Sequence, residues 1–416
     1  MIISRNIIEN VAKEAILVHK EDKHAESYIR EQREVQLNYL YALVLFLYNL
    51  DKLKDSIFTV KNNLFYLPVY LDNSYPFDFL CQDLGLKDTF TLGGNGTYSF
   101  NETSEQVKIF LEVFERKIKQ KKETIQKQNI EERFKGFYAD LIFHLKKDVT
   151  SCKYLPEHYF PVKLKELPVE EAHWLNEVVA AYKNDPRYKR AKITDKKFFE
   201  KYHKTCSYFT NVLESGTDFL VFSIQFRIQN QHTLSGNLFR DFKHDFLNYR
   251  RGYKKLASIA GSIGYWELDQ KSNLAFRMYF IVPDIGLDVM EWQEDIIYYW
   301  ENILFDRFIK KYKLANSNLV FMANSVPLSL SYKNFKGKSI KISKKHKARI
   351  QDFCQTVVAY IVLSELYFYP YPLQLRLHAV RQIDSKVDTT KPIVITNKNK
   401  TSRVFRGHIK KENTKD

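Results

Sequence analysis

Cysteine is scarce in this chain, and the few that occur are scattered. The 416 residues include four, without a Cys-x-x-Cys pair among them: Cys81, Cys152, Cys206 and Cys354. This spacing argues against a disulfide framework and against a zinc ribbon. His203 and Cys206 are spaced like half of a metal site, but the sequence shows no second half. We therefore expect no metal and no other cofactor.

Long apolar runs and a secretory leader are also lacking. The most apolar run, LNYLYALVLFLYNL at residues 37–50, is too short to span a bilayer and predicts a buried helix. The N-terminus, MIISRNIIENVAKEA, lacks the positively charged region and apolar core of a signal peptide. These features predict a soluble, cytoplasmic protein without a membrane partner.

Aromatic residues and positive charge are abundant instead. The chain holds 27 Tyr and 31 Phe, which supply core and also surfaces on which bases can stack. Lys and Arg number 65 against 49 acidic residues, a net charge of +16. Such an excess favours a polyanionic partner, most often nucleic acid, although many basic proteins have no such partner. The length and the 44% of hydrophobic residues predict a globular chain of two or three domains.

The first 205 residues have mostly helical patterns and no motif that indicates a role. Helices are predicted by periodicity and by end signals at 26–50, 104–147 and 169–184. The stretch TFTLGGNGTYSF at 89–100 predicts a β-hairpin, because β-forming residues flank Gly-Gly-Asn-Gly. A phosphate-binding loop is the alternative, but the helix with Lys and Ser or Thr that it requires does not follow. The domain boundary is expected near residue 205, after a run rich in basic and aromatic residues.

Residues 206–410 have a different pattern, in which strands alternate with helices. DFLVFSIQFRIQ alternates apolar and polar residues over 218–229 and predicts a half-buried strand. Two more strands are expected at Gly261–Leu268 and 274–282, and further helices are expected at 238–256, 289–313 and 346–369. This order predicts an α+β domain: an antiparallel sheet with helices on one face. The end of the chain, 411–416, is expected to be a mobile tail.

One segment of the C-terminal half has no acidic residue. KNFKGKSIKISKKHKAR, residues 333–349, contains seven Lys and one Arg. As a loop or a mobile arm it would attract a phosphate backbone, and a solvated linker is the equal alternative. The candidate nucleic-acid contacts are the cations of this segment, one cation on a predicted strand and two near the C-terminus: Arg227, Lys333, Lys336, Lys338, Lys341, Lys344, Lys345, Lys347, Arg349, Arg403 and Arg406.

Four short motifs occur in a suggestive order between residues 217 and 407. They are GSIGYWELD, LAFRMYFIV, IIYYWENIL and SRVFRGH. Their order and spacing resemble the YagK/YfjJ-like group of inovirus-type replication proteins, which in turn resemble rolling-circle initiators of the His-hydrophobic-His endonuclease class. The resemblance covers the C-terminal half and implies a replication-initiator endonuclease-like fold there. The first 200 residues match no family that we can name.

The resemblance implies a metal site that this chain has lost. In that family, alternate histidines on one strand hold a divalent metal that polarises the scissile phosphate. Phe276 and Met278 occupy the matching positions, and neither is a ligand for magnesium or manganese. Glu267 occupies the place of a neighbouring acidic ligand, so the three residues are expected to lie around one vacated site. The simpler interpretation makes Phe276 and Met278 sheet core and pairs Glu267 with an arginine such as Arg277.

The resemblance also implies a nucleophilic tyrosine on a later helix. Tyr360 in VVAYIVLSEL lies on the expected helix, and Tyr367 is the other candidate. In a chain with so many tyrosines, a packing role for both is the simpler interpretation. The lysine that often follows one turn after the nucleophile is replaced by Leu363 or Ser364.

Three functions remain open from the sequence. The favoured one is a DNA-binding protein derived from a replication initiator of a phage or mobile element, holding single-stranded or hairpin DNA without nicking it. The second is an active, metal-dependent tyrosine nicking enzyme that uses Glu267 with histidines from elsewhere, such as His232 or His244. The third is a protein-interaction module in phage defence or anti-defence, in which the positive charge is incidental.

Overall fold

The chain forms two compact units. The computed structural model describes residues 4–20, 169–215, 218–229, 256–268, 274–313, 318–343 and 345–367, with shorter stretches within 44–66, 90–98, 105–120, 245–253 and 404–406. The sheet unit comprises residues 1–33, 91–97 and 198–416, and the second unit comprises 34–90 and 98–197. The units divide inside helix α7 (Pro186–Glu214), seven or eight residues before the predicted boundary.

The second unit contains the predicted helix at 169–184, which is α6 (Val169–Lys183). Asp185 and Pro186 end this helix and start the next one. The Asp185 carboxylate accepts a hydrogen bond from the Arg187 backbone N–H at 2.9 Å, and proline is favoured at a first helical position. A buried chain of hydrogen bonds joins the helices: Tyr182 donates to Gln106 at 2.9 Å, and Gln106 donates to Asp195 at 2.8 Å. Strands β1 (Thr59–Lys61) and β2 (Leu64–Tyr66) pair antiparallel.

Other predicted elements are described in part. Strands β3 (Phe90–Leu92) and β4 (Gly96–Tyr98) form a two-stranded sheet, which confirms the hairpin at 89–100. The helices predicted at 26–50, 104–147 and 238–256 are described only at scattered positions, where the backbone is helical or, at Tyr253, bent. The predicted tail at 411–416 lies outside the described residues. No helix in the described part of the chain is both long and apolar enough to cross a membrane.

An antiparallel sheet is the centre of the sheet unit. Its strands are β5 (Phe219–Gln229), β6 (Gly261–Leu268), β7 (Leu274–Pro283), β8 (Val320–Val326), β9 (Ser339–Ile342) and β10 (Val404–Arg406). The strand order is β10-β6-β7-β5-β8, and β9 pairs with the first part of β5. The α+β class and the antiparallel sheet are therefore confirmed. The three long central strands are the three that the sequence predicts.

One face of the sheet carries the aromatic core. Because neighbouring residues of a strand point to opposite faces, the even-numbered residues of β5 and β7 share this face. They pack against α9 (Val289–Tyr298), the π-helical segment η8 (Tyr299–Leu304) and α10 (Phe305–Tyr312). Trp300 is fully buried between Phe226 and Phe276, with ring centroids 5.0 and 5.3 Å away.

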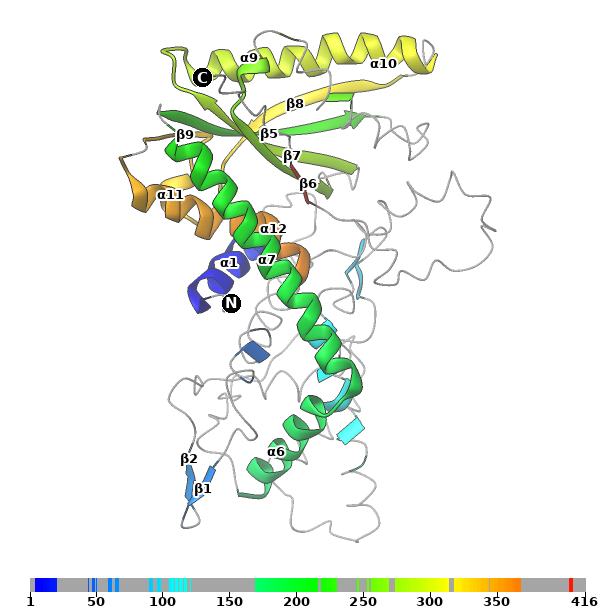
Figure 1. Cartoon of the computed structure of the whole chain (residues 1–416). Coiled ribbons are helices and arrows are strands. Elements are labelled where there is room, and N and C mark those ends of the chain that lie inside the picture. Colours follow the sequence, from blue (N-terminus) through cyan, green and yellow to red (C-terminus); the bar gives the residue numbers. More distant parts are fainter. Residues whose placement is uncertain are drawn as a thin grey trace. The chain divides into compact units, whose positions relative to one another are not determined.

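The opposite face is covered as well. Figure 1 shows α9 and α10 on one side of the sheet and α11 (Lys347–Phe353) and α12 (Ala359–Tyr367) on the other. Tyr360 of α12 contacts the Tyr265 ring of β6, and the Tyr208 hydroxyl of α7 lies 3.3 Å from where a Cβ on Gly261 would be. The expectation of helices on one face is therefore wrong. Ser223 is fully buried, although the alternation in DFLVFSIQFRIQ predicted a half-buried strand with this residue on its polar side.

The basic segment, residues 333–349, is folded rather than an extended arm. After β8 the chain leaves the edge of β5, forms the short 3-10 helix η9 (Lys333–Phe335), and returns to the same edge as β9. Backbone hydrogen bonds close this excursion, from Leu328 N–H to the Gly337 carbonyl at 3.0 Å and from Ser329 N–H to the Phe335 carbonyl at 2.8 Å. The segment ends in the first turn of α11. The prediction of a loop or mobile arm is corrected on this point.

The N-terminal helix belongs to the sheet unit. Helix α1 (Arg5–Lys20) packs on α12, and its Glu14 carboxylate enters the loop after β8. There Glu14 accepts hydrogen bonds from the Leu330 and Ser331 backbone N–H groups at 2.8 Å each. It also accepts from the Ser329 and Ser331 hydroxyls at 2.7 Å each. This buried carboxylate ties α1 to the loop that leads into the basic segment.

Glu14→Gln is expected to lower the free energy of unfolding by about 2 kcal/mol. The amide group cannot satisfy the backbone donors as a charged carboxylate does, and it brings N–H groups toward other donors. Urea denaturation of the variant measures this loss. Lys13→Gln, at an exposed position of the same helix, is the matched control and is expected to change stability by less than about 0.5 kcal/mol. Equal stability of both variants would contradict the role of Glu14.

Candidate functional site

Phe276 and Met278 lie side by side in the aromatic core. Both side chains are fully buried. In the register of β6 and β7, Trp266 is opposite Phe276 and Gly264 is opposite Met278. The Phe276 ring stacks on Phe226 with centroids 5.0 Å apart. Their interpretation as sheet core is therefore confirmed, and neither residue faces an open groove.

Glu267 points to the other face of the sheet. It is opposite Ala275, so its side chain shares a face with the odd-numbered residues of β7. The expectation that Glu267, Phe276 and Met278 surround one site is wrong. Successive side chains of a strand point to opposite faces of the sheet. A motif alignment that is wrong by one residue therefore assigns every aligned side chain to the wrong face. The residues of β7 that share a face with Glu267 are Arg277 and Tyr279.

Glu267 belongs to a closed polar cluster between the sheet and α12. Gln225 of β5 donates to its Oε1 atom at 2.6 Å, and Arg277 Nε lies 3.4 Å from the same atom. The side chains of Arg277 and Glu267 are 12% and 9% exposed. The Arg277 guanidinium lies over the Tyr265 ring, 5.9 Å from the centroid. The pairing of Glu267 with Arg277 is therefore confirmed.

The electrostatics of the cluster favour a fixed ion pair. Burial alone would lower the pKa of Arg277, but the Glu267 carboxylate and the surrounding phenols outweigh it and raise the pKa above its ordinary value. Burial raises the pKa of Tyr265, and the positive charge of Arg277 opposes this only in part. A guanidinium therefore occupies the space beside the one carboxylate, and a cation there repels a metal ion. Among the described residues, no three His, Cys, Asp or Glu side chains are grouped to hold a metal.

Both candidate nucleophiles are packed into the sheet unit. Tyr360 is 5% exposed, and its ring meets Tyr265 edge to face with centroids 5.9 Å apart. Tyr367, near the end of α12, is also 5% exposed. Tyr360 lies on the side of the sheet that carries Arg277, but it is buried there against the Tyr265 ring. The arrangement suits packing better than attack on a phosphate.

The cations of the basic segment are exposed where the structure describes them. Lys341 forms ion pairs with Asp284 and Asp218, and Arg349 donates to the Lys341 carbonyl at 3.1 Å. The other described cations have no ion pair with a described carboxylate: Lys333, Lys336, Lys338, Lys345 and Lys347. A set of unpaired, exposed ammonium groups on a folded edge of the sheet is suited to contact with phosphate groups.

The remaining candidates contribute less to this surface. Arg227 is half-buried in β5, and its guanidinium lies beside Asn324 of β8. Arg406 lies in β10, but its side chain is outside the described residues, as are Lys344 and Arg403. His232 and His244, which a rearranged metal site would need, also lie outside the described residues.

A second basic surface was not singled out from the sequence. In the part of α7 that belongs to the second unit, Arg187 is exposed and pairs with Asp185 and Glu112. Five further cations are exposed there: Lys189, Arg190, Lys192, Lys196 and Lys197. The signal was present as the basic and aromatic run before residue 205. Exposed aromatic rings, in contrast, are rare. Of the aromatic residues that the structure describes, Tyr298 is the exposed one, with 54% of its surface accessible.

No protein-family model matches this chain, and comparison with curated proteins and with solved structures finds no match. The resemblance to replication initiators therefore depends on the four sequence motifs alone.

Proposed function

We propose that this protein binds nucleic acid, with DNA as the expected partner, and contacts the phosphate backbone through the basic segment. The observation that carries the proposal is the exposure of five lysines within 333–349 that have no described carboxylate partner. Each such group that meets a phosphate releases a counterion, which is the main source of affinity in backbone binding. The net charge of +16 and the exposed cations of α7 support the same partner.

We further propose that the sheet unit is the scaffold of a nicking enzyme without its chemistry. The motif order supports the kinship. The Arg277 side chain beside Glu267 supports the loss of a metal site on that face of the sheet. The full burial of Phe276 and Met278 in the aromatic core supports a packing role for these two residues. A phosphotyrosine mechanism needs a metal-polarised phosphate and a nucleophile within reach of it. The packing of Tyr360 supports a structural role for that residue.

Binding by backbone contact is expected to be broad rather than base-specific. Both sheet faces are covered and the described aromatic rings are mostly buried, which leaves few stacking platforms for unpaired bases. Single-stranded, hairpin and duplex DNA of unrelated sequence are therefore expected to bind with affinities within about tenfold of one another, in the micromolar range.

Fluorescence anisotropy with labelled single-stranded, hairpin and duplex oligonucleotides tests the proposal. Polyglutamate, a polyanion without phosphate, serves as competitor and is expected to displace DNA poorly. Incubation of the same oligonucleotides with manganese tests for nicking and for a covalent protein–DNA adduct. Absence of binding at low salt would contradict the proposed partner. Nicking with an adduct that Tyr360→Phe abolishes would establish the active-enzyme alternative instead.

A further inference from the structure

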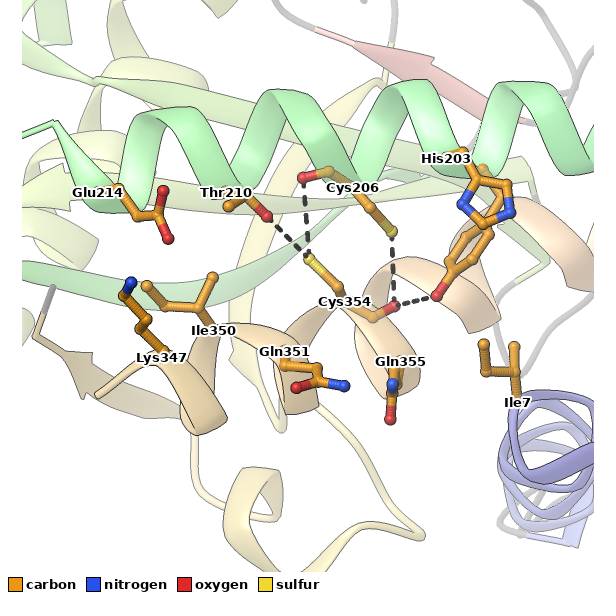
Figure 2. A pocket seen from close by; sticks show the side chains of 11 residues that line it. Ile7, His203, Cys206, Thr210, Glu214, Lys347, Ile350, Gln351, Cys354 and Gln355 are labelled. Atoms are coloured by element: carbon orange, nitrogen blue, oxygen red, sulfur yellow. Dashed lines mark hydrogen bonds between the residues drawn. The ribbon is translucent and has the colours of Figure 1, made fainter. Parts of the chain in front are cut away.

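A pocket of about 380 Å³ opens in the sheet unit, away from the Glu267 cluster. It lies beside α7, α11 and the π-helical segment η10 (Cys354–Val358), and Figure 2 shows the side chains that line it. Polar groups such as His203, Thr210 and Gln351 share the lining with the apolar Ile350. The pocket is therefore accessible to small polar molecules. Of the five lysines in the proposed nucleic-acid contact, Lys347 lines this pocket, and the other four do not.

Two reduced cysteines meet at the wall of this pocket. Cys206 comes from α7 and Cys354 from η10, 148 positions later in the chain. Each sulfur lies beside the backbone of the other residue: Cys206 Sγ is 4.0 Å from the Cys354 carbonyl oxygen, and Cys354 Sγ is 3.9 Å from the Cys206 carbonyl oxygen. Figure 2 shows these two contacts as dashed lines. The side chains are thus already directed across the same gap.

Neighbouring side chains of α7 contact both the backbone and the sulfur of Cys354. The Tyr202 hydroxyl donates to the Cys354 carbonyl at 3.3 Å, and the Thr210 hydroxyl lies 3.9 Å from its sulfur. Cys354 is the first residue of a π-helical segment, a widened turn that often marks a functional position in a helix. This second feature sets the pair apart from two cysteines that are neighbours by chance.

The two thiols are not equivalent. The hydrogen bond from Cys206 lowers the pKa of the Cys354 thiol, with a smaller contribution from Thr210, although burial opposes both. The same hydrogen bond, together with burial, raises the pKa of Cys206. The thiolate is the nucleophilic form of cysteine. We assign the first attack to Cys354, whose sulfur has the Thr210 hydroxyl 3.9 Å away.

We propose that Cys206 and Cys354 are an oxidative modification site, at which a small hydroperoxide entering through the pocket converts the two thiols into a reversible disulfide. The bridge joins α7 to the helical segment that continues into α12. It closes a long loop of the chain, and constraints on long loops restrict the unfolded state most.

The reaction is balanced by the hydroperoxide alone. The Cys354 thiolate attacks the terminal peroxide oxygen, so an S–O bond forms and the O–O bond breaks. The leaving group is an alkoxide, or hydroxide when the oxidant is hydrogen peroxide, and it takes up a proton. Cys354 is then a sulfenic acid. The Cys206 sulfur then attacks the Cys354 sulfur, its proton goes to the departing hydroxide, and water leaves. Two thiols are oxidised and one peroxide is reduced.

Hydrogen peroxide treatment of the folded, full-length protein tests the proposal. The oxidised protein is denatured, its free thiols are alkylated, and peptides are mapped by mass spectrometry without reductant. We expect a peptide pair that joins Cys206 to Cys354, a mass about 2 Da lower, and full reversal by dithiothreitol. The bridge is also expected to raise the melting temperature by about 5 °C.

The variant Cys81→Ser/Cys152→Ser removes the other two cysteines and is the matched control. It is expected to form the same bridge as the wild type, whereas Cys206→Ser should stop at a sulfenic acid on Cys354. Two outcomes would overturn the proposal: both thiols remaining alkylatable after peroxide, or a bridge that forms only in denatured protein. A bridge formed with diamide but not with peroxide would overturn the assignment of the oxidant.

Discussion

The double variant Phe276→His/Met278→His is expected to lose roughly 5 kcal/mol of unfolding free energy and to bind no metal. Both positions are fully buried, and the rings of Phe226 and Trp300 lie 5.0 and 5.3 Å from Phe276. Two imidazoles there would bury polar nitrogens without partners and leave gaps among the aromatic rings. Glu267 could not complete a metal site, because its side chain lies on the other face of the sheet.

Urea denaturation measures this loss, and the melting temperature with and without manganese or zinc measures metal binding. The control variant Val320→His/Met322→His places the same residue pair on edge strand β8, where Val320 is 47% exposed. It is expected to lose less than about 1 kcal/mol. A double variant at 276 and 278 that is stable and gains melting temperature with metal would mean that these positions are ligand positions after all.

Arg277→Met is expected to lower the free energy of unfolding by about 4 kcal/mol. Removal of one partner of a buried ion pair leaves the other charge without compensation, which costs more than the pair itself contributes. Glu267 would then retain Gln225 as its remaining hydrogen-bond donor in the cluster, at 2.6 Å. Methionine keeps much of the arginine volume, so the loss would report mainly on charge.

A double-mutant cycle separates the ion pair from packing. Glu267→Gln alone is also expected to destabilise the protein, whereas Arg277→Met/Glu267→Gln should recover at least about 1 kcal/mol relative to the sum of the single changes. Lys310→Met, at an exposed position of α10, controls for the removal of a positive charge. Additive effects of the two single changes would contradict the account of the cluster.

The central strands were predictable because their patterns are local. Alternation in DFLVFSIQFRIQ predicted β5 and its inward residues, and the polar turn between two apolar runs predicted β6 and β7. The alignment of ligand positions was not predictable in this way, since motif order does not specify which face a residue occupies. The β6–β7 register, which pairs Glu267 with Ala275, is what assigned the faces.

The sequence did not predict strands β8 and β9 or the second layer of helices. Strands β8 and β9 are short, and β9 lies inside the lysine-rich segment, where charge masks the alternation of Ile340 and Ile342 with polar residues. The second helix layer was missed because Ser223 and Gln225 resemble solvent-facing residues of a half-buried strand. The meeting of Cys206 and Cys354 depends on tertiary packing across 148 positions and leaves no local pattern.

The salt dependence of DNA binding tests the central claim most directly. Log affinity is measured against log salt for the wild type, for Lys336→Gln/Lys338→Gln/Lys345→Gln, and for the control Lys204→Gln/Lys310→Gln/Lys313→Gln. All six lysines are exposed residues of the sheet unit, and both variants lose the same charge. If the basic segment contacts phosphates, its variant loses about 2 units of slope and the control keeps the wild-type slope. Equal slopes for the two variants, or no binding by the wild type, would contradict the account.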